Sequence, residues 1–194
     1  MQRITAEELP YAVERARFLF SITGFLALAV LAGTAMGVRI VRTRQDHAML
    51  RTPWLLLLLA VFGLWSLALT VYGGWSLLAS YSGWHLLPPA AAGRYWISLS
   101  LGLIGVYGTI GDLRYIKRPR PTPMAWWYRH MECMLGAGIG FHAAFFVFGA
   151  SRLLKLHLQG VWQLLPWLLP FAIGVPAMMI WIRHYERKFE GAAS

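Results

Sequence analysis

Five long apolar stretches constrain this 194-residue chain more than any other feature of its sequence. A helix needs about 20 mostly apolar residues to cross the hydrocarbon core of a bilayer. Stretches of about this length occupy residues 18–38, 54–79, 95–111, 131–150 and 161–182. Only 13% of all residues are charged, whereas a soluble domain holds about a quarter. The sequence therefore predicts an all-α fold, an integral membrane bundle of five transmembrane helices, and excludes a soluble globular domain.

The connections between these stretches are short, so residues 18–190 are predicted to form a single transmembrane domain. Residues 1–17 precede it and carry mixed charge. Thr5 and Glu8 match a capping box, and Pro10 suits the first turn of a helix. We therefore expect residues 1–17 to form a short interfacial segment.

The positions of the basic residues predict an orientation in the membrane. All 18 Lys and Arg residues lie outside the predicted spans, twelve toward one membrane face and six toward the other. By the positive-inside rule, the N-terminus is predicted outside and the C-terminus in the cytoplasm, in a bacterial inner membrane. The predicted cytoplasmic set comprises Arg39, Arg42, Arg44, Arg51, Arg114, Lys117, Arg118, Arg120, Arg129, Arg183, Arg187 and Lys188.

The net charge of +10 is therefore interpreted first as a topology signal. Its second expected consequence is attraction to anionic lipid headgroups, at about 1 kcal/mol per basic residue near the surface. Nucleic-acid binding is not favoured, because the sequence contains no recognised nucleic-acid-binding motif.

Few ionisable groups lie within or at the ends of the predicted spans, and each is a candidate for function because such groups are costly in a bilayer. They are Asp112, His130, Glu132, His142 and His184. All but His142 are predicted at the cytoplasmic face, where the Asp112 carboxylate could orient the His130 imidazole. Such clusters occur in proton relays, metal sites and haem surroundings, and also in salt-bridge networks that bind nothing. The sequence leaves both interpretations open.

The histidines raise the question of a haem or metal cofactor. His142 lies near mid-depth, where it is expected either to stay neutral and bond a backbone carbonyl or to bind haem or a metal. His130 and His142 are 12 residues apart, about 120° around a helix, so they do not share a face. A haem b would therefore need His130 with His184, or His142 with Met178, Met179 or a second chain. His130, His142 and His184 are accordingly the metal-ligand candidates.

Glycines recur at the three- and four-residue spacings that let transmembrane helices approach one another closely. We expect these glycines to mark helix-packing faces, and we expect Pro170 and Pro176 to kink the fifth stretch. The glycines are Gly33 and Gly37 in the first stretch, Gly102, Gly105 and Gly108 in the third, and Gly136 and Gly140 in the fourth.

Residues 103–185 carry a combination of motifs that is moderately specific. The motifs are Asp112 at the end of a span, Arg118-Pro119 in a basic loop, Trp126 or Trp127, His130, Met134-Leu135-Gly136-Ala137, Leu168-Leu169-Pro170, Gly174-Val175-Pro176 and Trp181-Ile182-Arg183. In this combination the sequence resembles an uncharacterised family of small bacterial multi-pass membrane proteins, a DUF2306-like domain of unknown function. The resemblance implies a helical membrane fold and points to Asp112 and His130, without implying a reaction. The chain departs from the family pattern at Cys133, Gly138 and His142.

Three functions remain as hypotheses. The sequence favours a non-enzymatic subunit or assembly protein of a membrane complex, or a homo-oligomer, because the loops are short and no catalytic constellation is recognised. An enzymatic role is left open. The first alternative is a b-type haem redox module that uses His130 with His184, or His142. The second alternative is a proton-coupled carrier of small solutes that uses Asp112, His130 and Glu132.

Overall fold

The computed structural model describes residues 9–44, 46–82, 92–118, 122–147 and 165–190, and within these ranges the chain is helical without any strand. Five long helices and one short 3-10 helix follow one another. They are α1 (Leu9–Thr43), η1 (His47–Leu50), α2 (Pro53–Tyr81), α3 (Ala92–Lys117), α4 (Ala125–Phe145) and α6 (Leu165–Glu190). The predicted all-α fold is thereby confirmed.

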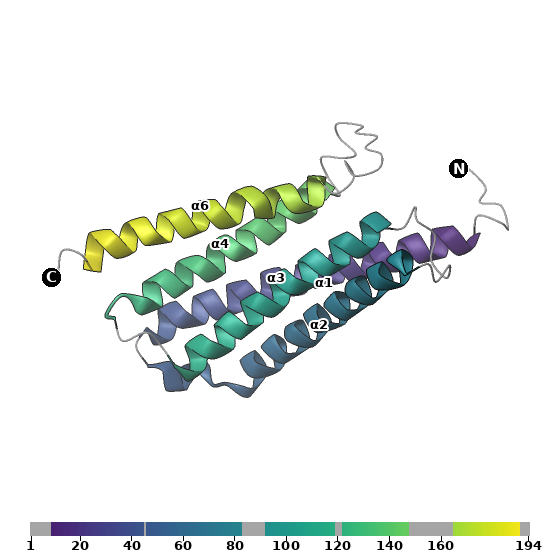
Figure 1. The fold of residues 1–194 in the computed structure, drawn as a ribbon. Coiled ribbons are helices and arrows are strands. Elements are labelled where there is room, and N and C mark those ends of the chain that lie inside the picture. Colours follow the sequence, from purple (N-terminus) through teal and green to yellow (C-terminus); the bar gives the residue numbers. More distant parts are fainter. Residues whose placement is uncertain (1–8, 45, 83–91, 119–121, 148–164, 191–194) are drawn as a thin grey trace.

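The five long helices run side by side along a common axis, and each runs opposite to the one before it in the chain (Figure 1). As a result α1 begins at one end of the bundle and α6 finishes at the other. We call the end where α1, α3 and α6 finish the basic end, because most of the basic residues lie there. Asp46 begins η1 at this end, where its carboxylate accepts a hydrogen bond of 3.2 Å from the Ala48 backbone N–H.

The core lies around α1, which contacts α2, α3 and α4. The most extensive helix pairs are α2 with α3 and α1 with α4, while α6 packs on the outer side of α4. Most of the completely buried apolar side chains come from α1, α2 and α3. They are Ile22, Met36 and Ile40 of α1, Leu55 and Leu59 of α2, and Leu101 of α3, together with Leu50 of η1 and Ala143 of α4.

Four helices are long and apolar enough to cross a membrane, namely α1, α2, α3 and α6. The helix α4 is not among them, because Arg129, His130 and Glu132 near its start and His142 near its end lower its mean hydropathy. Length and composition therefore support four of the five predicted spans.

The helix ends differ from the predicted ones mainly because the helices extend beyond the apolar stretches. The helix α1 runs without interruption from Leu9, so residues 9–17 continue into the predicted span as one helix. The expected capping box at Thr5 and Glu8 lies outside the described residues, as do residues 148–150 and 161–164 of the last two predicted spans. Pro170 and Pro176 lie inside α6, which remains helical through both.

Several of the predicted packing glycines lie at close helix contacts. A Cβ added at Gly33 would lie 3.1 Å from the Cys133 carbonyl oxygen, and one at Gly37 would lie 2.9 Å from the Met134 sulfur, so α1 meets α4 here. Among the predicted glycines, Gly102 makes the closest approach to backbone, since its added Cβ would lie 2.6 Å from the Thr70 nitrogen of α2. Without glycine at these positions, the backbones could not come so near to one another.

The remaining predicted glycines divide into two groups. Gly105 lies against Ser66 and Phe25, and an added Cβ at Gly140 would make an ordinary 3.7 Å contact with Val30. An added Cβ at Gly108 or Gly136 would meet no described atom within 4 Å, so these two do not mark close contacts between the described helices.

Gly73 of α2 was not predicted from sequence spacing, but it lies very close to the α3 backbone. A Cβ there would lie 2.5 Å from the Leu99 nitrogen and 2.7 Å from the Tyr95 carbonyl oxygen.

A pair of alanine substitutions on α3 separates packing from helix propensity. Gly102→Ala is expected to lower stability by about 1–3 kcal/mol, because the new methyl group meets α2 backbone that cannot rotate away. Gly108→Ala, in open space, is expected to be neutral or to stabilise by up to about 1 kcal/mol through helix propensity alone. Thermal unfolding of the purified protein in detergent measures both, and equal shifts would contradict the observed packing.

Candidate functional site

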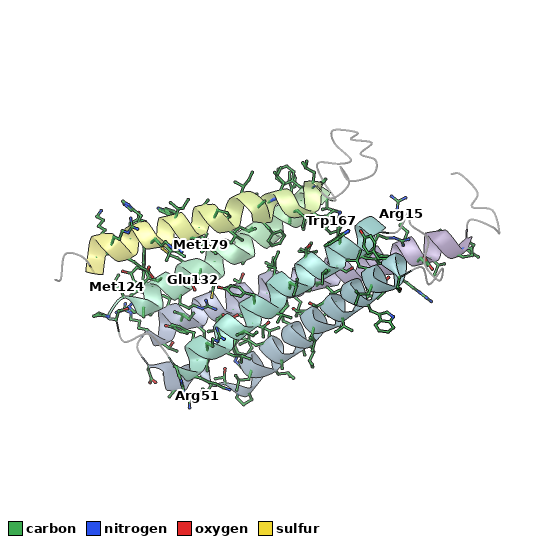
Figure 2. The ribbon with its side chains drawn as sticks, viewed as in Figure 1. Arg15, Arg51, Met124, Glu132, Trp167 and Met179 are labelled. Atoms are coloured by element: carbon green, nitrogen blue, oxygen red, sulfur yellow. The ribbon has the colours of Figure 1, made fainter. Side chains whose placement is uncertain are left out.

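The predicted polar residues of α3 and α4 gather near the basic end of the bundle. Asp112 lies on the penultimate turn of α3, and His130 and Glu132 lie on the second turn of α4. Figure 2 labels Glu132 on α4 toward the same end as Met124 and Arg51. The topology thus brings together residues from two helices that follow each other through a short loop.

Arg129 is the centre of this cluster. Its Nη2 donates a hydrogen bond of 2.7 Å to Oδ1 of Asp112 across the α3–α4 gap. Its Nη1 donates to Oε2 of Glu132, three residues further along the same helix. The side chains of Arg129 and Asp112 are only 18% and 11% exposed. One guanidinium therefore binds two carboxylates in a largely buried setting.

The residues around Arg129 leave space for its guanidinium group and make further contacts with the ion pair. A Cβ at Gly111 would lie 3.2 Å from Nη2, so glycine leaves the room that the group occupies. The ring of Tyr115 lies 6.0 Å from Cζ in a cation–π arrangement. The buried Cys133 thiol donates a weak hydrogen bond of 3.8 Å to Asp112 Oδ1. We refer to Asp112, Arg129, Glu132 and Cys133 as the Arg129 network.

The Arg129 network joins two helices, α3 and α4, that otherwise have few contacts with each other. The helices α3 and α4 are not among the pairs that pack extensively, since α3 packs on α2 and α4 packs on α1 and α6. Desolvating two charges costs several kcal/mol, so a buried ion pair adds little net stability compared with apolar packing. Removing one partner, however, leaves an uncompensated buried charge. The network therefore fixes how α3 sits beside α4.

The expected contact between Asp112 and His130 does not form. The structure pairs Asp112 with Arg129 instead, while His130 Nδ1 lies 2.9 Å from the Gly37 carbonyl oxygen of α1. Consecutive residues on a helix point in directions about 100° apart. The His130 side chain therefore points toward α1, whereas the Arg129 side chain points toward α3. Gly37 is also where α1 and α4 approach closely, which brings its carbonyl within reach of the imidazole.

Arg129 is the site residue that sequence reasoning missed. The sequence places it among the basic residues that predict the orientation, two positions before the predicted fourth span. Its spacing of three residues from Glu132 was the available signal, because residues at i and i+3 are neighbours on a helix surface.

The other two candidate histidines lie apart from the Arg129 network. His142 is exposed, and its Nδ1 lies 2.7 Å from the Gly138 carbonyl oxygen of its own helix. His184 is exposed on α6, with its ring centroid 5.5 Å from that of Tyr185. The side chains of His142 and His184 therefore lie on the outer surface of the bundle.

The pairing of His130 with His184 as ligands does not fit the helix faces. Ile139 of α4 packs against Gly174 of α6, and His130 precedes Ile139 by nine residues, about 180° around the helix. His130 therefore lies on the side of α4 opposite Ile139, where its Nδ1 contacts α1. In the part of the chain that the structure describes, no group of three or more His, Cys, Asp or Glu residues could hold a metal ion.

Comparison with known proteins adds no relative, since no family model, curated protein or solved structure matches this chain. The resemblance of residues 103–185 to a DUF2306-like family therefore stays a prediction.

The two carboxylates of the Arg129 network predict unequal effects on stability. Asp112→Asn is expected to destabilise the protein by about 3 kcal/mol or more, because it weakens the buried link between α3 and α4. Glu132→Gln is expected to cost under about 1 kcal/mol, since Glu132 is more exposed and bonds within its own helix. Reversible unfolding in mixed micelles measures the difference. A loss at Glu132 as large as that at Asp112 would contradict the assigned roles.

Proposed function

We propose that this chain is a non-enzymatic subunit or assembly protein of a complex in the bacterial cytoplasmic membrane, acting through helix contacts with a partner or a second copy. One observation carries this proposal: the polar groups available for chemistry are bonded within the chain. Asp112 and Glu132 both bind Arg129, and His130 lies at hydrogen-bond distance from a backbone carbonyl. Carboxylates held by a guanidinium are poorly suited to carry protons, which disfavours a proton-coupled carrier.

The helix α6 supplies the surface best suited to such contacts. It packs on α4 along one side and leaves the other uncovered. The uncovered side carries Leu169, Ile173, Pro176 and Ile180, spaced four, three and four residues apart, and all are exposed. This is the periodicity of helices that pack lengthwise against another helix. Prolines at 170 and 176 also leave backbone carbonyls one turn earlier without their helical donor, which a neighbouring helix can help to satisfy.

Native mass spectrometry of the full chain in gentle detergent tests the assembly role. The expected result is a defined oligomer or a stoichiometric partner, and Ile173→Arg, which places a charge on the uncovered side of α6, is expected to abolish it. Leu103→Arg on the exposed side of α3 is the matched control and should leave the assembly intact. A monomer without a partner would overturn the proposal.

The proposed orientation places the basic end in the cytoplasm and the N-terminus outside, with α4 crossing the membrane in addition to α1, α2, α3 and α6. Eleven of the described Lys and Arg residues lie at the basic end and three at the other. At the basic end Arg39 and Arg44 lie over the rings of Trp54 and Trp126, an arrangement suited to headgroup depth. Close packing of α4 along α1, from Gly37 to Val30, supports a membrane position for α4 despite its polar residues.

Cysteine labelling tests the orientation directly. In a Cys133→Ser background, Leu9→Cys is expected to react with a membrane-impermeant maleimide in intact cells, because it precedes the first span on the outside. Lys188→Cys is expected to react only after the membrane is permeabilised. The reverse pattern would overturn the orientation, and labelling of both in intact cells would overturn the odd number of spans.

A haem-binding role is the second candidate, and the geometry of His130 favours it specifically. Metal-bound histidines usually donate their other ring N–H to a carbonyl or carboxylate. With Nδ1 beside the Gly37 carbonyl, His130 would keep Nε2 as the ligating atom. His142 has the same relation to Gly138. Since His184 lies on another face, the second ligand would come from a second chain or a methionine.

An absorption spectrum separates this candidate from the first. If haem b binds through His130, the purified protein is expected to show a Soret band that His130→Ala abolishes and His142→Ala leaves in place. A colourless protein that gains no such band on incubation with haem b would exclude this candidate.

A further inference from the structure

A hollow of about 480 Å³ lies at the C-terminal end of α3, and its described lining residues are all basic. They are Arg114, Lys117 and Arg118. The hollow is open to its surroundings rather than enclosed. The hollow is distinct from the Arg129 network, because Asp112, Tyr115 and Ile116 on the same turns of α3 are buried on the inner side.

The three cations share one face because of their spacing. Lys117 follows Arg114 by three residues and Arg118 follows it by four, and residues at these separations are neighbours on a helix. All three side chains are exposed, and none forms an ion pair with a carboxylate in the described ranges of the chain. Like charges at this spacing repel one another. A bound anion would remove that repulsion.

Interaction with the helix dipole explains only part of this arrangement. Cations near a helix C-terminus are favourable on their own. The dipole, however, requires neither three of them on one face nor a hollow between them. The last turns of α6 also carry three exposed basic residues, Arg183, Arg187 and Lys188, which provide a comparison set at the same end of the bundle.

We propose that this hollow binds the phosphate-bearing headgroup of an anionic phospholipid. The helix α3 is long and apolar enough to cross a membrane, and its candidate span ends at Lys117, so the hollow lies where headgroups lie. Arginine guanidinium groups bind phosphate oxygens in pairs, and lysine adds a point charge. A single phosphate fills only part of the volume, which leaves space for the glycerol portion of a headgroup. The site requires a membrane-embedded chain, but neither the orientation nor the assembly role proposed above.

The test compares two triple variants of the full-length protein, delipidated in detergent. One is Arg114→Gln, Lys117→Gln and Arg118→Gln, and the control is Arg183→Gln, Arg187→Gln and Lys188→Gln, which removes the same charge at the same end. Binding of phosphatidylglycerol and phosphatidylcholine is followed by native mass spectrometry at physiological ionic strength, with glycerol phosphate and inorganic phosphate as soluble probes.

Wild-type protein is expected to prefer phosphatidylglycerol, and the α3 triple variant to lose on the order of 30-fold or more in affinity for it, as three cations near a lipid surface allow. The control is expected to lose under about 3-fold. The α3 variant should fold at least as well as wild type, since it relieves like-charge repulsion; if it does not fold, Lys117→Gln alone serves, with Lys188→Gln as its control. Equal losses in variant and control, no preference between the lipids, or inorganic phosphate binding as tightly as the lipid would each overturn the proposal.

Discussion

The ion pair between Arg129 and Asp112 is the contact on which the arrangement of this bundle depends. It spans the one neighbouring helix pair in the chain order, α3 and α4, that does not pack extensively. Because it is largely buried, neither charge can be separated from the other without leaving an uncompensated ion. Apolar packing holds α2 to α3, α4 to α1, and α1 to α2. The ion pair adds the polar link between α3 and α4 near the basic end.

Close packing elsewhere makes that contact geometrically available. Gly33 and Gly37 let α4 approach α1, and the same approach brings His130 to the Gly37 carbonyl. Once His130 faces α1, the helix places Arg129, one residue earlier, toward α3. Between helices in lipid, packing and hydrogen bonds rather than the hydrophobic effect drive association. The glycine contacts between α1 and α4 and the polar network between α3 and α4 therefore depend on the same rotation of α4, and a defect in the first would displace the second.

The candidate site was only partly predictable. Asp112, His130 and Glu132 stood out because ionisable groups are costly near a bilayer, and the structure does place them at one end of the bundle. Their pairing was wrong, since Asp112 binds Arg129 and not His130. Spacing rules describe which residues share a helix face, but not which face meets which neighbour. The same limit explains why Gly108 and Gly136 matched a packing pattern and nevertheless face open space.

The sequence by itself determined that this chain forms long helices of membrane-spanning length, because apolar runs bounded by charged loops admit little else. It also determined the uneven distribution of basic residues between the two ends. Only the tertiary structure decided which polar groups meet, and that three cations at the end of α3 surround a hollow. The physical reason is that helix formation depends on neighbours along the chain, whereas the rotation of each helix against the next depends on the packing of residues far apart in sequence.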